Sequence, residues 1–127
     1  MNYEIDITFE GDHVLVRTSG EKNYAVVEEI WSGVSRVCEQ HQCFNVLGIA
    51  NTSQPIEVIE GYELPAVFAA HNIDHRYRLA WVELSPEGVD MIDLVVSILD
   101  NRGLPGRRFD TVDEAKAWLL GSSETSR

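Results

Sequence analysis

The order of the apolar segments along the chain is the feature that most constrains its fold. Apolar side chains at residues 5–9 alternate with polar ones, and Val14 and Val16 repeat the alternation after a Gly-Asp turn signal. This pattern predicts a β-hairpin. Further strands are predicted at 44–50, 78–84 and 107–109, each followed by a helix. The order predicts an α/β fold: a single domain with a mixed, mainly parallel five-stranded sheet and about four helices.

Helical spacing of apolar residues marks two of the longer helices. In residues 23–41 the apolar positions recur at intervals of three and four, at Val27, Ile30, Trp31, Val34 and Cys38. A second helix is predicted to begin with Ser85 as its N-cap and Pro86 at its first position, and Gly103 suits its C-terminal turn. Its predicted buried stripe consists of Met91, Leu94, Val95, Ile98 and Leu99.

Residues 51–72 have a less regular pattern. The apolar run at 44–50 is too short for a helix and ends in a polar segment, 51–55, which predicts a loop. Gly61 and Pro65 interrupt the helical pattern that follows. We therefore expect an irregular segment from residue 56 and a helix over 63–72.

The closing segment RRFDTVDEAKAWLLG, residues 107–121, predicts a strand followed by a capped helix. Thr111 and Glu114 have the spacing of a capping box. The predicted apolar stripe of this helix consists of Val112, Ala115, Trp118 and Leu119. We expect one domain over residues 1–121 and a disordered polar tail over 122–127.

The composition argues against several classes of partner. The 127 residues include 21 acidic and 10 basic side chains, which gives a formal net charge of -11. Such a charge disfavours nucleic acids and anionic membrane surfaces. Neither a secretory signal nor an apolar run of about 20 residues is present, so we expect a cytoplasmic protein without integral membrane association. The cysteines, Cys38 and Cys43, do not form a disulfide or zinc pattern.

These elements together resemble the SpoIIAA-like branch of the STAS superfamily, the α/β fold shared with bacterial anti-sigma factor antagonists. The resemblance covers roughly residues 4–121. It rests on the opening hairpin, the strands FNVLGIA (44–50) and RLAWVEL (78–84), the helix ending in NRG, and the closing segment 107–121. Packing and capping explain each of these motifs, so the resemblance is specific to a fold rather than to a function.

The resemblance implies a phosphorylation site after the third strand. In the antagonists a partner kinase modifies a serine there, and the matching segment of this chain contains Thr52 and Ser53, without the aspartate and glycine of the family motif. A phosphate would add about -1.5 to -2 charges to an already acidic protein, which would repel a partner at this edge. The alternative interpretation is that these residues only form hydrogen bonds within a turn.

The branch is also similar to SEC14-type domains, which implies a lipid-like or other apolar ligand beneath residues 56–72. Tyr62, Leu64, Val67 and Phe68 are the candidate pocket residues, because apolar ligands are enclosed mainly by hydrophobic side chains. The alternative is that the same side chains belong to the ordinary core.

Five arginines form a candidate docking patch for an acidic partner: Arg76, Arg78, Arg102, Arg107 and Arg108. They precede or open the strands at 78–84 and 107–109, so parallel strands would bring them to one edge of the sheet. In so acidic a chain, the alternative is that they pair with its own carboxylates.

The sequence contains no recognisable metal or nucleophile pattern. His71 and His75, with Asp74 between them, lack a third strong ligand, so no metal is predicted. Cys38 lies in a buried helical stripe, and no carboxylate is placed to orient His41. No cofactor is indicated.

The sequence therefore favours a non-enzymatic binding or regulatory protein, whose partner is either a protein or a small apolar molecule. A phosphorylation-controlled antagonist-like switch is one alternative. The other is an enzyme that acts at the carboxyl edge of the sheet through Ser85, Asp110 or His71. A homodimer through an exposed sheet edge or helix face is compatible with each of these functions.

Overall fold

The computed structural model describes residues 3–54, 62–103 and 106–121. Its sheet has the strand order β1-β2-β3-β4-β5. The strands are β1 (Tyr3–Phe9), β2 (Val14–Glu21), β3 (Asn45–Gln54), β4 (Arg78–Glu83) and β5 (Gly106–Phe109). The β1–β2 pair is antiparallel and the other three pairs are parallel, which confirms the predicted mixed, mainly parallel sheet.

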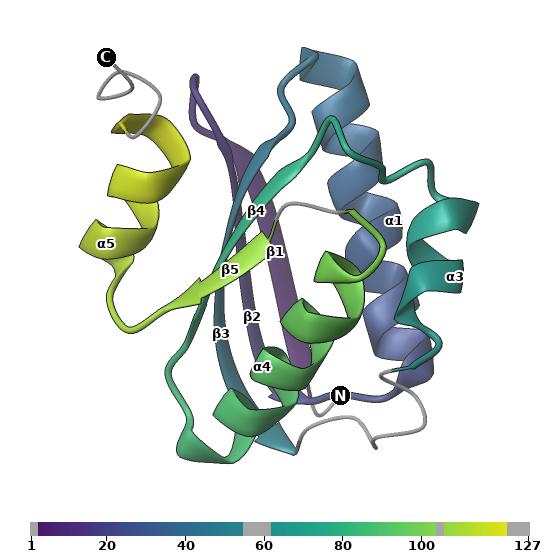
Figure 1. Ribbon diagram of the computed structural model, residues 1–127, viewed down its shortest axis with the longest axis vertical. Helices are drawn as coiled ribbons and strands as arrows, with labels where there is room; N and C mark the ends of the chain where they lie inside the picture. Colours follow the sequence, from purple (N-terminus) through teal and green to yellow (C-terminus); the bar gives the residue numbers. More distant parts are fainter. Residues whose placement is uncertain (1–2, 55–61, 104–105, 122–127) are drawn as a thin grey trace.

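Helices cover both faces of this sheet (Figure 1). They are α1 (Tyr24–His41), α3 (Leu64–Ala70), α4 (Pro86–Asp100) and α5 (Val112–Lys116), and α5 continues into the π-helical turn η1 (Ala117–Gly121). Helices α1, α3 and α4 lie on one face and α5 lies on the other. The chain thus forms three layers, with the α/β architecture that the sequence predicts.

Each face of the sheet has its own hydrophobic core. The larger core packs the α1, α3 and α4 side chains against one face, and buried members include Val34, Phe68, Leu79 and Leu99. The smaller core lies under α5, where Ala115 and Leu119 pack on Leu47, Ala80 and Val82. Because successive strand residues point to opposite faces, residues 79 and 81 of β4 enter the larger core while residues 80 and 82 enter the smaller one.

Strand β3 is longer than predicted. The segment 51–54, which the sequence analysis assigned to a loop, continues the strand, and Asn51 and Thr52 pair with Ser19 and Gly20 of β2. The prediction was wrong because it relied on the polarity of these side chains. Thr52 is 1% exposed and its polar atoms are hydrogen-bonded inside the protein. The remainder of the predicted loop, together with residues 56–61, lies outside the described residues.

Of the two predicted helix N-caps, Thr111 forms its capping hydrogen bond and Ser85 does not, while Asn23 caps α1 without having been predicted to do so. The Asn23 side chain accepts from the Val26 N–H at 3.0 Å, and Thr111 Oγ1 accepts from the Glu114 N–H at 3.1 Å. Ser85 occupies the N-cap of α4, but its hydroxyl donates to the Glu87 carboxylate instead of accepting from the helix backbone. The cap position was therefore predicted correctly, and the capping hydrogen bond was not.

Two further helix predictions require adjustment. In the α4 stripe, Val95, Ile98 and Leu99 are buried, but Met91 and Leu94 are half-buried. Trp118 of the closing segment is also half-buried, because it lies in the π-helical turn against Phe109 and Arg78 at the surface. The α3 helix lies within the predicted 63–72, and the tail 122–127 lies outside the described residues.

Candidate ligand-binding site

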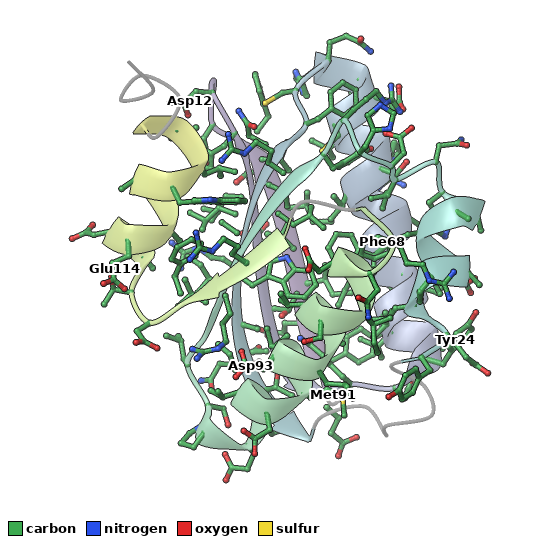
Figure 2. The ribbon with its side chains drawn as sticks, viewed as in Figure 1. Asp12, Tyr24, Phe68, Met91, Asp93 and Glu114 are labelled. Atoms are coloured by element: carbon green, nitrogen blue, oxygen red, sulfur yellow. The ribbon has the colours of Figure 1, made fainter. Side chains whose placement is uncertain are left out.

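An apolar pocket of about 90 Å³ lies between the sheet and the helices α1, α3 and α4. Strands β2, β3 and β4 form its floor. The described residues that form its apolar walls include Val16, Val27, Ile30, Trp31, Val46, Leu64, Trp81, Met91, Ile92 and Val95. Gly48 widens it at the centre of the floor, because β3 has no side chain there beside Trp81. Figure 2 shows Met91 on α4 and Tyr24 at the start of α1 at the same end of the molecule.

A buried carboxylate forms part of the pocket lining. Glu83, the last residue of β4, is only 8% exposed. Its Oε2 accepts from the backbone N–H of Thr52 at 2.9 Å and from that of Ser85 at 3.2 Å, and its Oε1 accepts from Thr52 Oγ1 at 2.8 Å. A buried carboxylate requires such donors to compensate for the loss of water. The hydrogen bonds therefore hold Glu83 in one orientation.

Strand alternation explains why this carboxylate is buried. Leu79 and Trp81 point into the larger core, and Glu83 follows them at the same spacing of two. Gly88, in the first turn of α4, lies directly against it. A β-carbon at this position would lie 2.5 Å from Glu83 Oε1, so the close approach requires glycine.

A lysine lines the same pocket. Lys22 lies between the end of β2 and the N-cap of α1, and its side chain is half-buried. Gly20 has a φ of 97°, and the β2–β3 register shifts between Gly20 and Glu21, where the chain leaves the sheet. Burial lowers the pKa of Lys22, and the negative charge of Glu83 offsets this decrease only in part.

The pocket combines apolar walls with a small polar side. Apolar walls enclose most of it, while Thr18, Lys22, Thr52 and Glu83 supply its polar groups. Within the described parts of the chain, no three His, Cys, Asp or Glu residues are grouped to hold a metal ion. The arrangement can enclose an apolar group and can form hydrogen bonds with a polar group beside it.

Comparison with known proteins provides a structural relative. No family model matches the sequence, and no curated protein matches it. An anti-sigma factor antagonist from Mycobacterium paratuberculosis has a similar crystal structure, with a TM-score of 0.62 over 92% of this chain and 93% of that chain. This chain has the fold of an anti-sigma factor antagonist. The sequence identity is 14%, so the likeness concerns the fold alone, and this is the α/β fold that the sequence resemblance implied.

The four candidate pocket residues have different positions in this fold. Leu64 lines the pocket. Val67 and Phe68 are each 1% exposed and belong to the larger core, where the Phe68 ring packs 4.6 Å from that of Trp31 (Figure 2). Tyr62 is 60% exposed. The pocket lies beside α3, and its described walls come mainly from the sheet, α1 and α4.

The two candidate phosphorylation sites also differ. Ser53 is exposed on β3. The Thr52 hydroxyl is buried and donates to Glu83, so a kinase cannot reach it in this structure. Of the two, only Ser53 stays a candidate for modification.

The five arginines do not form one patch. Arg108 pairs with Asp93 of α4 at 2.6 Å, whereas Arg78 lies over the Trp118 ring on the α5 face, 4.4 Å from its centroid. Alternate residues of a strand point to opposite faces, which separates side chains that start at one edge. Arg76 pairs with Asp74 and Glu39. The remaining two are Arg107, which lies over the Phe109 ring, and Arg102, which is exposed after α4.

The residues of the enzyme alternative are not assembled around the pocket. Ser85 bonds to Glu87, and Asp110 pairs with Arg108 at 3.0 Å. His71 follows α3, and none of the three is among the described residues of the pocket lining. Burial raises the pKa of Cys38 to about 12, which disfavours the thiolate that a nucleophile requires.

Lys22, Glu83 and Gly88 were not predicted from the sequence. The signal for Glu83 is present in RLAWVEL, because alternation with Leu79 and Trp81 places its carboxylate on the buried face. The sequence has no comparable signal for Lys22, whose position depends on the turn between β2 and α1.

No helix in the described ranges is long and apolar enough to cross a membrane.

Proposed function

We propose that this protein works by binding, and that the pocket beneath α1, α3 and α4 holds the apolar part of a small molecule. The observation that carries the proposal is the pocket itself, an apolar space of about 90 Å³ with a polar side formed by Lys22, Thr52 and Glu83. Binding pockets typically combine apolar walls with a few fixed polar groups in this way.

The size of the pocket limits the enclosed group. An apolar cavity of roughly 150 Å³ holds benzene, so a space of about 90 Å³ holds an apolar group smaller than benzene. A short aliphatic group fits this limit. The positions of Ser85, Asp110 and His71 outside the described pocket lining favour binding over catalysis.

Binding of a neutral apolar probe tests the proposal directly. We expect n-butanol to shift the amide signals of residues around the pocket in NMR titrations. Gly48→Val should abolish these shifts, because its side chain would occupy the centre of the pocket floor. Asn51→Val is the matched control, since Asn51 is exposed on the same strand.

The outcome is decided by the difference between the two variants. Loss of the shifts in Gly48→Val and their retention in Asn51→Val would support the pocket. Shifts that are absent from the parent protein, or equal in both variants, would refute it. Native mass spectrometry and lipid extraction of protein purified from its own host would then identify the bound molecule.

A phosphorylation-controlled regulatory switch is a second candidate, favoured by the exposed Ser53. A phosphate there would add negative charge to a protein that already carries a net charge of -11. Incubation with kinases of the host should then place a phosphate on Ser53, and Ser53→Ala should remove it. An unmodified parent protein, under conditions that phosphorylate an anti-sigma factor antagonist, would exclude this candidate.

A further inference from the structure

The polar side of the pocket contains the ammonium group of Lys22. Lys22 is the cationic residue among the described residues of the pocket lining. In that described part of the chain, it forms neither a hydrogen bond nor an ion pair. An ammonium group has three donors, and the partial burial of the Lys22 side chain reduces their contact with water. A bound acceptor would therefore replace water that Lys22 has lost.

Glu83 does not act as a hydrogen-bond acceptor for the Lys22 ammonium. Its carboxylate accepts three hydrogen bonds from Thr52 and Ser85, which hold it against the ends of β3 and β4. Gly88 packs closely against the same carboxylate. Glu83 influences Lys22 by its charge alone.

The charge of Glu83 does not compensate for the burial of Lys22. The pKa of Lys22 is lowered by burial although the Glu83 carboxylate acts to raise it. A lowered lysine pKa means that the ammonium form is less stable here than in water. A second negative group beside Lys22 would stabilise that form.

We propose that the ligand is a small aliphatic carboxylate, with its apolar part in the pocket and its carboxylate bound to the Lys22 ammonium. This inference rests on the proposed function. A carboxylate carries one negative charge, which matches one lysine. A phosphate ester would place up to two charges next to Glu83 and repel it.

Three probes with the same alkyl chain test the role of charge: butanoate, n-butanol and butylamine. We expect butanoate to bind more tightly than n-butanol, and butylamine to bind most weakly. Lys22→Met retains most of the apolar stem and removes the ammonium. It should weaken butanoate binding by about tenfold or more, the loss expected for a hydrogen bond between charged groups, and leave n-butanol binding unchanged.

Lys116→Met is the matched control, since Lys116 is an exposed lysine of α5 on the other face of the sheet. It should bind all three probes as the parent does. If n-butanol binds at least as tightly as butanoate, or if Lys22→Met retains butanoate affinity, the carboxylate inference is wrong while the apolar pocket stands. If none of the probes binds, both the pocket and the inference fail.

Discussion

Thr52 donates two hydrogen bonds to Glu83, one from its backbone N–H at 2.9 Å and one from its hydroxyl at 2.8 Å. The two residues are 31 positions apart in the sequence. Their contact joins β3 to β4 beyond Ala50 and Glu83, the last pair of the ladder. It explains why the polar segment after residue 50 continues as a strand and why the pocket has a fixed polar side.

Substitution of Glu83 should distinguish hydrogen bonding from charge. Glu83→Met removes the acceptor for three donors and should lower the free energy of unfolding by about 3 kcal/mol. Glu83→Gln should cost only about 1 kcal/mol. Its carbonyl can still accept from the backbone N–H groups of Thr52 and Ser85, while its amide donates to the threonine hydroxyl. Urea denaturation monitored by circular dichroism would measure both values.

Glu28→Gln is the control for these two variants. Glu28 is exposed on α1, so its substitution should change the unfolding free energy by less than about 0.5 kcal/mol. A Glu83→Met protein as stable as this control would contradict the structural role of the buried carboxylate.

Gly88→Ala should be destabilising, although alanine usually stabilises a helix relative to glycine by about 0.5–1 kcal/mol. The new β-carbon would lie 2.5 Å from Glu83 Oε1 and 2.6 Å from its carboxyl carbon. The carboxylate would have to move away from Thr52, at a cost of about 1–3 kcal/mol. Ser97→Ala, at an exposed position of the same helix, provides the comparison. An increase in melting temperature for Gly88→Ala would show that Glu83 can move freely.

Trp118→Ala should cost less than the loss of a fully buried tryptophan. The Trp118 ring is half-buried between Arg78 and Phe109, so we expect a loss of about 2 kcal/mol. Trp81→Ala should cost about 3–5 kcal/mol, because Trp81 is only 7% exposed. Guanidinium denaturation would measure the unfolding free energy of the two variants. Equal losses of unfolding free energy would mean that both rings lie in equivalent environments.

The two cysteines should differ in their reaction with iodoacetamide. Burial raises the pKa of Cys38 to about 12, so at pH 8 its thiol is almost entirely protonated and shielded from the reagent. Cys43 is half-buried. Mass spectrometry of the native protein should find modification at Cys43 alone, and of the urea-unfolded protein at both. Rapid native labelling of Cys38 in a Cys43→Ser variant would indicate that α1 opens.

Local patterns were sufficient for most of the fold. The alternation in residues 5–9, the helical spacing from Val27 to Cys38 and the cap at Thr111 each depend on side chains close in sequence. Such patterns determine which face of an element is buried, so the hairpin, the main helices and the order of the elements along the chain followed from them. The prediction failed at 51–54, where a polar side chain is buried through a contact with a distant strand.

By itself, the sequence determined an α/β domain with a mixed five-stranded sheet, because the periodicity of apolar residues specifies the elements and their order. Only the tertiary structure decided where a ligand can bind. Lys22, Thr52 and Glu83 lie on three separate segments, and the pocket exists because Gly48 and Gly88 leave space or allow close approach at two points of the packed layers. Contacts of this kind depend on the packing of distant segments, which no local pattern of residues encodes.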